Sequence, residues 1–565
     1  MAGASLLSSD DHSSPISGVR ICYNFNRMEI EAQNRQEEGR FAPYILSEHR
    51  DQAREGRGGA GATIPSGMPP TPHPRYEGAR DAPDYDNLLA CIRCGACLPV
   101  CPTYNTDLLE VQSPRGRVQL IRQVEEGLLE PSETFLEHMY HCLDCRACQS
   151  ACPTGVRIGE QVLKARVQME RARKQSPIKK LGLHFALGDQ RRLELLMLPI
   201  VLYQRSGLQW LVRRTRLLHR ILPRRLRLLA FMEELLPERI PLRSLRRRIA
   251  TVVPAQGEKR YRVGFFLGCV MSTMFAETSS ATLRVLSENG CEVVTPKTQK
   301  CCGAPHAEEG DFESVRRFAR HNIALFERYN VQYIICDCAA CGAQTKEYAE
   351  LLHDDPRWAQ RAARFSAKVR DIMEFLAEIP LREPVSMVAA RVAYHEACHL
   401  CHAQRVRREP VEVLGRVPGL ELVPLNESDM CCGSAGVYNL THNERSLKIL
   451  ERKMNNIEAT NAGVVLAGNP GCMLQLDYGR RVAGSDKQVL HPVQVLDAAY
   501  RAGRQARFSG VDPGRRLVGR DGRVYAVAAD GRSRVALAHA ATGSFRRNRH
   551  NGRGWTEDHR QESGC

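Results

Sequence analysis

The chain has 565 residues, of which 43% are hydrophobic and 25% charged, a composition ordinary for a folded water-soluble protein. This length is too great for one compact core, so we expect two to four folded units. No stretch approaches 18 consecutive apolar residues, and the N-terminus lacks the basic and apolar segments of a secretory signal. We therefore expect a cytoplasmic protein without a transmembrane helix.

The formal net charge of +16 is concentrated in two segments. Residues 191–250 carry +11 and residues 505–565 carry +6, which leaves about −1 for the remainder. Nucleic-acid binding needs basic groups across a folded face, usually with exposed aromatic residues, and only 6% of the residues are aromatic. We expect no nucleic-acid partner. A contact with anionic lipid or with an acidic protein fits the two basic segments better.

The two ends of the chain differ from its middle. Residues 1–80 are rich in Gly, Ser, Pro and charged residues, and they are predicted to be disordered. Residues 505–565 are predicted to be disordered as well, although their VYAVAA and RVALAHAA runs allow a short hairpin.

Residues 176–255 have Leu at helical spacing with Arg between. Pro199, Pro223 and Pro237 interrupt the pattern, which predicts a linker of three or four short helices. The simplest interpretation packs Leu inward with Arg in solvent. A peripheral contact with a membrane surface or a partner is the alternative.

The 22 cysteines are unevenly distributed, and 20 of them lie between Cys91 and Cys472. A chain without an export signal is expected to keep its thiols reduced, which argues against a disulfide framework. Most of the cysteines stand in tight clusters with two-residue gaps, which is the spacing of metal ligands.

Residues 81–175 contain two cysteine runs with identical spacing. They are Cys91-x2-Cys94-x2-Cys97-x3-Cys101-Pro102 and Cys142-x2-Cys145-x2-Cys148-x3-Cys152-Pro153. In the bacterial ferredoxin pattern, three cysteines of a run bind one [4Fe–4S] cluster and the fourth binds its neighbour. We therefore expect two clusters, one on Cys91, Cys94, Cys97 and Cys152, the other on Cys142, Cys145, Cys148 and Cys101. Zinc, which also binds four cysteines, is the alternative.

The second half of the chain contains an internal repeat. RVGFFLGC (262–269) matches RVAYHEAC (391–398), EVVTPKTQKCCG (292–303) matches ELVPLNESDMCCG (421–433), and YIICDCAAC (333–341) matches VVLAGNPGC (464–472). Short apolar strands alternating with helical patterns predict two α/β domains with parallel strands, at 256–388 and 389–504. The cysteines follow strands, and the carboxyl ends of strands are where such sheets place their sites.

Each repeat contains a set of cysteines whose spacing differs from that of the ferredoxin runs. The first has Cys269, Cys301, Cys302, Cys338 and Cys341; the second has Cys398, Cys431, Cys432 and Cys472, with Asn469 in the place of Cys338. Adjacent buried thiolates repel unless a metal neutralises them, and the glycine after each pair permits a tight turn. Cys401 is an additional thiol, and we expect His399 and His402 beside it to be neighbours of a site rather than ligands. Cys291 and Cys336 are expected in the core.

The double ferredoxin run followed by two Cys-Cys-Gly (CCG) domains resembles the iron–sulfur subunit of glycolate oxidase (glycolate dehydrogenase). The segments YHEACHL, SDMCCGSAGVYNLTHNERSLKILERKMNNI and GNPGCMLQL carry the resemblance, which spans about residues 83–503. The pattern is also similar to the iron–sulfur subunit of anaerobic glycerol-3-phosphate dehydrogenase and to heterodisulfide reductase subunits. We expect an α+β protein: a mainly α-helical ferredoxin-type domain followed by two tandem α/β cysteine-rich domains.

The resemblance implies an electron-transfer subunit at the inner face of the cell membrane. Its partners would be FAD-containing subunits that oxidise a 2-hydroxy acid, and a quinone or another respiratory acceptor. The chain has no G-x-G-x-x-G after a predicted strand, so we expect no substrate oxidation by this chain alone. A glycerol-3-phosphate or lactate dehydrogenase subunit, or a disulfide-cleaving reductase, is the alternative.

In heterodisulfide reductases, complete CCG motifs hold a non-cubane [4Fe–4S] cluster. The resemblance therefore implies a third cluster in the first repeat, with zinc or metal-free thiols as alternatives. Asn469 puts a complete ligand set in the second repeat in doubt.

Overall fold

In the computed structural model, the described residues are 80–173, 185, 187–223, 226–384 and 386–509, with the backbone of 525–527 and 534–536. The predicted disorder of residues 1–79 and of most of the tail lies outside these residues, as do Cys22 and Cys565. Strands β10 (Tyr525–Val527) and β11 (Arg534–Ala536) pair antiparallel, which confirms the hairpin.

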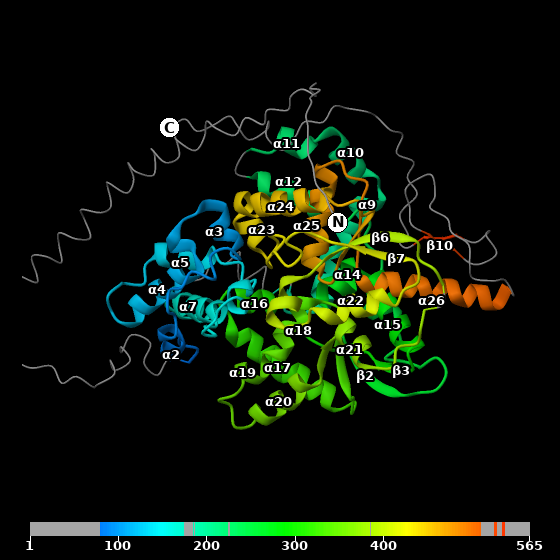
Figure 1. Ribbon diagram of the computed structural model, residues 1–565, viewed down its shortest axis with the longest axis horizontal. Helices are drawn as coiled ribbons and strands as arrows, with labels where there is room; N and C mark the ends of the chain where they lie inside the picture. Colours follow the sequence, from blue (N-terminus) through cyan, green and yellow to red (C-terminus); the bar gives the residue numbers. More distant parts are fainter. Residues whose placement is uncertain are drawn as a thin grey trace, which may run out of the picture. The chain divides into compact units, whose positions relative to one another are not determined.

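The ferredoxin domain is mainly helical, as predicted (Figure 1). Pro102 opens α3 directly after Cys101, because the fixed φ of proline suits a first helical turn. Ser113 and Ser132 cap α4 and α5 by accepting hydrogen bonds from backbone N–H groups. Its elements are α2 (Tyr85–Leu89), α3 (Pro102–Asp107), η1 (Glu110–Gln112), α4 (Pro114–Glu125), α5 (Glu133–Tyr140), α6 (Ala147–Ser150) and α7 (Ile158–Ala172).

The linker forms helices α9 to α13. The prediction that Pro199 would end a helix is wrong, because α9 continues through it. Pro199 is exposed, so its ring lies on the solvent side of the helix. The bounds are α9 (Gln190–Arg205), α10 (Leu208–Thr215), α11 (Leu217–Ile221), α12 (Arg227–Leu235) and α13 (Leu245–Arg248).

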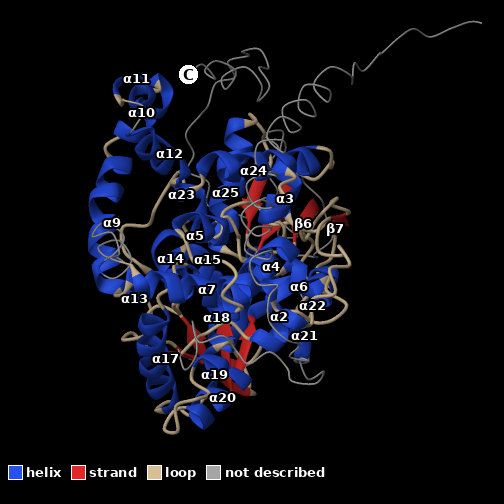
Figure 2. Ribbon diagram, turned by 90° about the vertical axis from the view of Figure 1, so that its left-hand side faces the viewer, coloured by secondary structure: helices blue, strands red, loops and turns tan. Residues whose placement is uncertain are grey.

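The expectation that the linker packs its leucines inward is wrong for much of its length. Helices α9 to α12, drawn together at one side of Figure 2, expose many large apolar side chains. The described helices include none that is long and apolar enough to span a membrane. The exposed apolar residues of this segment are Leu195, Leu196, Leu198, Leu202, Leu208, Trp210, Leu211, Leu217, Ile221, Leu226, Leu228, Leu229 and Met232.

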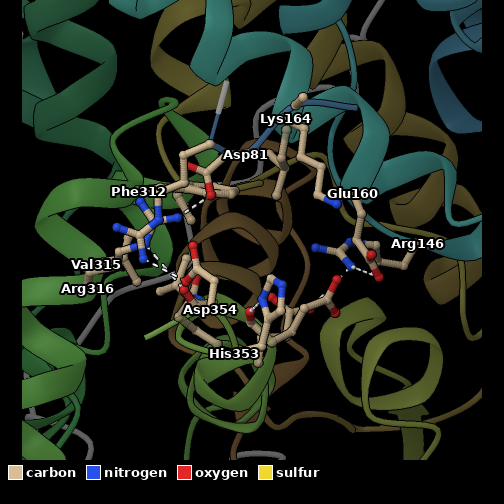
Figure 3. Close-up of a pocket in the computed structure, with 17 residues that line it drawn as sticks. Asp81, Arg146, Glu160, Lys164, Phe312, Val315, Arg316, His353 and Asp354 are labelled. Carbon is tan, nitrogen blue, oxygen red and sulfur yellow. Dashed lines mark hydrogen bonds and ion pairs between the residues drawn. The ribbon is translucent and has the colours of Figure 1, made fainter. Parts of the chain in front are cut away.

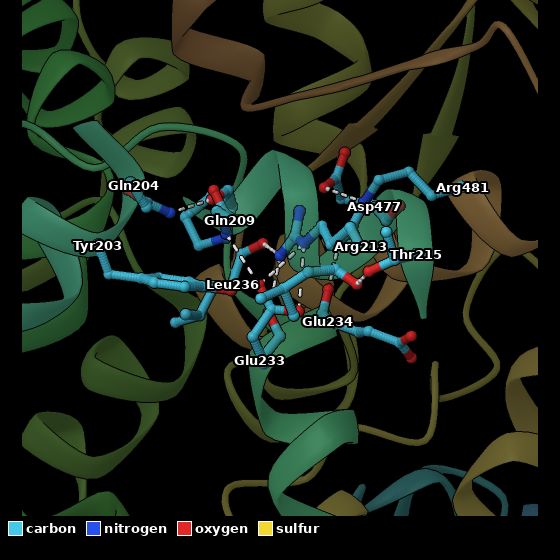
Figure 4. A network of polar contacts seen from close by, with 12 residues as sticks. Tyr203, Gln204, Gln209, Arg213, Thr215, Glu233, Glu234, Leu236, Asp477 and Arg481 are labelled. Atoms are coloured by element: carbon cyan, nitrogen blue, oxygen red, sulfur yellow. Dashed lines mark hydrogen bonds and ion pairs between the residues drawn. The ribbon is translucent and has the colours of Figure 1, made fainter. Parts of the chain in front are cut away.

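A polar network fixes the linker to the second CCG domain (Figure 4). Arg213 of α10 is ion-paired with Glu233 of α12 at 3.0 Å and donates to the carbonyl of Leu236. Arg481 of α25 (Pro470–Val482) donates to the Glu234 carbonyl at 2.6 Å. These arginines bind protein groups, whereas the leucines named above are exposed.

The first CCG domain has a five-stranded sheet in the order β1-β3-β2-β4-β5. Strands β3, β2, β4 and β5 are parallel, whereas β1, from the expected linker, pairs antiparallel with β3. The elements are β1 (Val252–Val253), β2 (Tyr261–Phe266), α14 (Cys269–Met274), α15 (Ala276–Glu288), β3 (Cys291–Val294), α16 (Ala304–Glu308), α17 (Phe312–Glu327), β4 (Tyr333–Cys336), α18 (Ala339–Lys346), α19 (Tyr348–Leu351), α20 (Ala359–Ala367), β5 (Val369–Asp371) and α21 (Ile372–Glu378).

The second CCG domain repeats this plan with a parallel sheet in the order β7-β6-β8-β9. Strands β2 and β6 occupy the same position in their sheets, as the sequence repeat predicted. The elements are β6 (Ala390–His395), the π-helix η4 (His399–Ala403), α22 (Arg408–Gly415), β7 (Leu420–Val423), α23 (Tyr438–Thr441), α24 (Asn443–Glu458), β8 (Val464–Ala467), α25 (Pro470–Val482), β9 (Gln488–Leu490) and α26 (Pro492–Ser509).

One hydrophobic cluster joins the two sheets. Val263 of β2 and Val392 of β6 are fully buried in it, together with residues of α15 and α26. Cys291 and Cys336 are fully buried in strands β3 and β4, as expected. The shared core holds the carboxyl ends of both sheets, and so the cysteine sets, in fixed positions.

Candidate metal centres

Four cysteines from both ferredoxin runs line one small cavity. Burial raises the pKa of Cys145 and Cys148 well above the ordinary range, and neighbouring sulfurs add to the effect. Sulfurs this close become thiolates only when a cation neutralises them, so the donor set fits an iron–sulfur cluster. The structure brings together the residues expected for the second cluster; their role as ligands stays a prediction. The four are Cys101, Cys142, Cys145 and Cys148.

The other expected set lies nearer the surface. Cys97 is buried, and burial raises its pKa to about 11, while Cys91 is half-buried and Cys94 is exposed. Cys91 and Cys152 pack against the hydrophobic cluster that contains Cys97. Burial works against the Cys152 thiolate, but hydrogen bonds from Thr154 and nearby backbone N–H groups lower its pKa. This sulfur therefore has the donors that suit a cluster ligand.

The last cysteine of each run has a threonine neighbour. Thr103 Oγ1 lies 3.3 Å from Cys101 Sγ, and Thr154 Oγ1 lies 3.4 Å from Cys152 Sγ. Both pairs come from a Cys-Pro-Thr sequence. A hydrogen bond to a ligand sulfur favours the more negative, reduced state of a cluster and so raises its potential.

We expect Thr154→Val to lower the reduction potential of one of the two clusters by about 20–40 mV. This is the one-electron equivalent of losing a hydrogen bond worth about 0.5–1 kcal/mol. A redox titration followed by EPR measures the shift. Thr154→Ser keeps the hydroxyl and should leave the potential unchanged, so an equal fall in both variants would contradict this account.

The five cysteines of the first CCG domain meet at the carboxyl edge of its sheet, as predicted. Cys269 follows β2, Cys301 and Cys302 follow β3, and Cys338 precedes α18 after β4. Cys341 lies in the first turn of α18. All five side chains are buried.

The thiols of this set form a continuous series of contacts, from Cys269 through Cys301, Cys302 and Cys341 to Cys338. Hydrogen bonds from Cys301 and Cys341 lower the pKa of Cys302 to about 6 in spite of burial. Backbone N–H groups also donate to Cys301, Cys302 and Cys338 at 3.4–3.5 Å. Five buried sulfurs supplied with donors fit an iron–sulfur cluster or a metal ion.

The glycine after each cysteine pair has a steric role. Gly303 and Gly433 adopt φ of +98° and +88°, in the left-handed region that favours glycine. A Cβ at Gly303 would lie 2.8 Å from the Val315 side chain, and one at Gly433 would lie 2.7 Å from the Ser446 carbonyl oxygen. The predicted tight turn is therefore present in both repeats.

The second CCG domain holds a shorter series of thiols. Cys398 contacts Cys431, Cys431 contacts Cys432, and Cys432 contacts Cys472. Cys401 does not complete the set, because its thiol is directed to the carbonyls of Glu396 and Cys398 at 3.7 and 3.9 Å.

The two histidines next to this set have other partners. His402 contacts Ser150 Oγ at 3.1 Å and the Asp429 carbonyl at 3.2 Å through its two ring nitrogens. His399 lies 3.8 Å from Asp144. Burial disfavours its charged form, but Asp144 and the Cys398 sulfur raise its pKa well above the ordinary value. The expectation that both are neighbours of the site rather than ligands stays a prediction.

Asn469, which replaces the fifth cysteine, connects the two CCG sets. Its Oδ1 accepts from the Cys338 thiol at 3.5 Å and from Ala340 N at 3.2 Å. Its Nδ2 donates to Cys472 Sγ at 3.7 Å. One amide side chain therefore contacts a sulfur of each set, so the sets lie next to one another.

The second ferredoxin run contacts the second CCG set. Cys145 shares a hydrophobic cluster with Cys398 and Cys431, and their sulfurs interact electrostatically. Arg166 of α7 donates to the Cys142 carbonyl at 2.6 Å and to the Glu308 carbonyl of the first CCG domain at 2.7 Å. The three domains are thus joined at the cysteine sites.

A cavity of about 360 Å³, lined by both charged and apolar side chains, lies between the ferredoxin and first CCG domains (Figure 3). Its lining includes Arg146, ion-paired with Glu347 at 3.2 Å, and Arg316, ion-paired with Asp81. None of the cysteines within the described part of the chain lines it. The cavity is therefore separate from the candidate metal sites.

His395 is a site residue that the sequence patterns did not single out. It ends β6, and its ring lies with the Cys432 and Cys472 sulfurs within 4.8 Å of one another. The repeat alignment could have pointed to His395, because this polar residue stands where the first repeat has Phe266.

Known proteins of similar sequence identify the family of this chain. A 403-residue alignment with the probable glycolate oxidase iron–sulfur subunit of Bacillus subtilis has 39% identity and covers 70% of this chain and 90% of that protein. The chain belongs to the family of glycolate oxidase iron–sulfur subunits. The Escherichia coli glycolate oxidase iron–sulfur subunit is 31% identical, covering 73% of this chain and 94% of the relative.

The descriptions of three protein families match separate segments of the chain. A 4Fe-4S dicluster domain covers residues 87–156, and a cysteine-rich domain covers 263–346 and 392–477. The linker region of the glycolate oxidase iron–sulfur subunit covers 174–236. The lactate utilization protein A of Shouchella clausii is 32% identical, over 42% of this chain and 98% of that protein. The predicted family, domain types and iron–sulfur cofactors are confirmed.

Proposed function

We propose that the chain accepts electrons from an FAD-containing subunit, which oxidises glycolate, and passes them to a quinone or another respiratory acceptor. The observation that carries the proposal is the order of the cysteine sites. One ferredoxin set reaches the surface at Cys94, and the other is buried against Cys398 and Cys431. Asn469 then connects the second CCG set to Cys338 of the first. When bound, [4Fe–4S] clusters supply single-electron redox chemistry at the ferredoxin positions.

The flavoprotein docks, in this proposal, on the surface around Cys94. Residues 89–100 and 108–111 form this surface. Arg115 joins these two segments by donating to the Arg93 carbonyl and to Glu110. An exposed apolar patch around an accessible ligand is typical of a protein interface, and it would bring the flavin close to that ligand. The exposed apolar residues of these segments are Leu89, Ile92, Val100, Leu108, Leu109 and Val111.

The complete first CCG set holds, in this proposal, a further iron–sulfur cluster. Its five cysteines are all buried, and three of them receive backbone N–H donors. Zinc is the competing occupant. Iron and zinc contents decide between the two.

The linker helices rest, in this proposal, on the inner face of the cell membrane, with the protein on the cytoplasmic side. Exposed leucines and Trp210 alternate along α9 to α12 with exposed arginines such as Arg205, Arg214 and Arg220. An apolar surface interleaved with arginine suits anionic lipid headgroups, since each basic residue near such a surface contributes about 1 kcal/mol. The respiratory acceptor is reached at this surface.

Reduction by glycolate tests the proposed function. We expect glycolate to bleach the visible absorption of this chain's clusters only when the FAD-containing subunit is present. Lactate and glycerol 3-phosphate should act more slowly in the same assay. Faster reduction by lactate would instead support the second candidate, a lactate-oxidising complex, which the similarity to lactate utilization protein A favours.

A further inference from the structure

His395 lies beside two cysteine sulfurs in the second CCG domain. One ring nitrogen of His395 and the sulfurs of Cys432 and Cys472 are within 4.8 Å of one another, and the three side chains are fully or almost fully buried. Imidazole and thiolate are the ligands that zinc prefers in proteins. His395 ends β6, Cys432 lies in the loop between β7 and α23, and Cys472 lies in the first turn of α25, so only the fold brings them together.

The His395 ring is fully buried, and the Ser428 backbone is the only hydrogen-bonding group of the described residues that acts on it. Neither ring nitrogen has a hydrogen-bond partner of good geometry among the described residues. A buried polar group left unpaired costs roughly 1–3 kcal/mol, and native structures rarely retain one without a reason. Coordination of a metal ion by one ring nitrogen would satisfy the group.

The charges around the set match a single divalent ion. Cys431 lies outside the 4.8 Å group, but its thiol contacts that of Cys432, so it is the available sulfur for a fourth ligand in a Cys₃His set. Lys453 is fully buried and interacts electrostatically with Cys431 and Cys432. A cation at Lys453 is placed to offset the excess negative charge of three thiolates bound to one zinc ion.

Asn469 argues against an iron–sulfur cluster at this place. Its amide is engaged with Cys338 on one side and with Cys472 on the other, so it does not act as a replacement ligand. The second repeat therefore lacks a sulfur that the first repeat has, and gains an imidazole where the first repeat has Phe266.

We propose that the second CCG domain binds one zinc ion through His395, Cys431, Cys432 and Cys472. The two CCG domains thus differ in their occupants although they share a fold, and the redox-inert zinc site bridges the buried ferredoxin set and the first CCG set structurally, without itself carrying electrons. The proposal does not depend on which substrate the complex oxidises.

The test is X-ray absorption at the zinc edge on the full chain, purified without oxygen and supplied with zinc alone. We expect about one zinc per chain with one imidazole nitrogen and three sulfurs in its first shell. His395→Ala should weaken zinc binding at least about 100-fold, measured by competition with a chromophoric chelator. His395→Cys should restore binding with a shell of sulfur only.

His402→Ala is the matched control, because its ring nitrogens already contact Ser150 and Asp429 and it should keep the zinc shell unchanged. The visible absorption of the ferredoxin clusters reports whether each variant is folded. Zinc retained by folded His395→Ala with an unchanged shell would overturn the proposal. So would iron in place of zinc at this site.

Discussion

Cys101→Ser is expected to remove the cluster of the buried ferredoxin set, whereas Cys97→Ser removes the cluster of the exposed set. The two cysteines are four positions apart in the sequence. Cys101, however, lines a cavity with Cys142, Cys145 and Cys148, which belong to the other run. Each variant should lose about four irons per chain, and each should lose a different EPR signal.

The buried set also determines the functional loss. Because Cys145 packs against Cys398 and Cys431, loss of this cluster separates the exposed set from the CCG domains. We therefore expect Cys101→Ser to abolish electron transfer from glycolate to the quinone, while the flavoprotein still reduces the exposed cluster. Cys401→Ser is the matched control, because Cys401 faces backbone carbonyls and should keep all of the iron. Loss of the same signal in both cluster variants would refute the shared-ligand assignment.

Leu198→Asp combined with Leu202→Asp is expected to release the protein from anionic vesicles. The two leucines are one turn apart on α9, and both are exposed. Burying each leucine in the lipid interface is worth about 1.5–3 kcal/mol, so the double change should weaken binding by roughly 100-fold or more. Cosedimentation with vesicles of phosphatidylglycerol and phosphatidylcholine measures the effect.

A control from the ferredoxin domain separates lipid contact from general stickiness. Leu128 is 72% exposed and lies outside the linker, so Leu128→Asp should bind vesicles like the unaltered protein. Binding should also fall at high salt and on purely neutral vesicles, because arginine contributes to it. If the linker variant bound as tightly as the unaltered protein, the exposed face would have to serve a protein partner instead.

The repeat and its cysteines could be predicted from the sequence because they depend on local order. A short apolar strand ending two or three residues before Cys269, Cys338 or Cys398 determines that the sulfur lies at the carboxyl edge of a parallel sheet. The Cys-Cys-Gly turn could be predicted from its glycine, and the steric demand at Gly303 and Gly433 comes from α17 and α24 of the same repeats.

Contacts between domains could not be predicted in this way. Nothing in the sequence says that Cys145 meets Cys398, or that Asn469 contacts a sulfur of each repeat. His395 is a similar case, because a lone histidine at the end of a strand is recognised as a candidate ligand only once the fold shows the sulfurs beside it.

The linker shows a different limit of sequence patterns. Leu at helical spacing gives the helices but not the direction of their apolar faces, and α9 to α12 leave many leucines outside the core. Pro199 within α9 is a further example, since a proline on the exposed side of a helix is compatible with its continuation.

The metal content of the anaerobically purified chain tests the central claim most directly. Iron, acid-labile sulfide and zinc are measured per chain, with EPR spectra before and after reduction. The account predicts about eight irons from the two ferredoxin sets, about four more from the first CCG domain, and about one zinc. Two or more zinc ions with almost no iron, and no EPR signal on reduction, would contradict the assignment of the chain as an electron carrier.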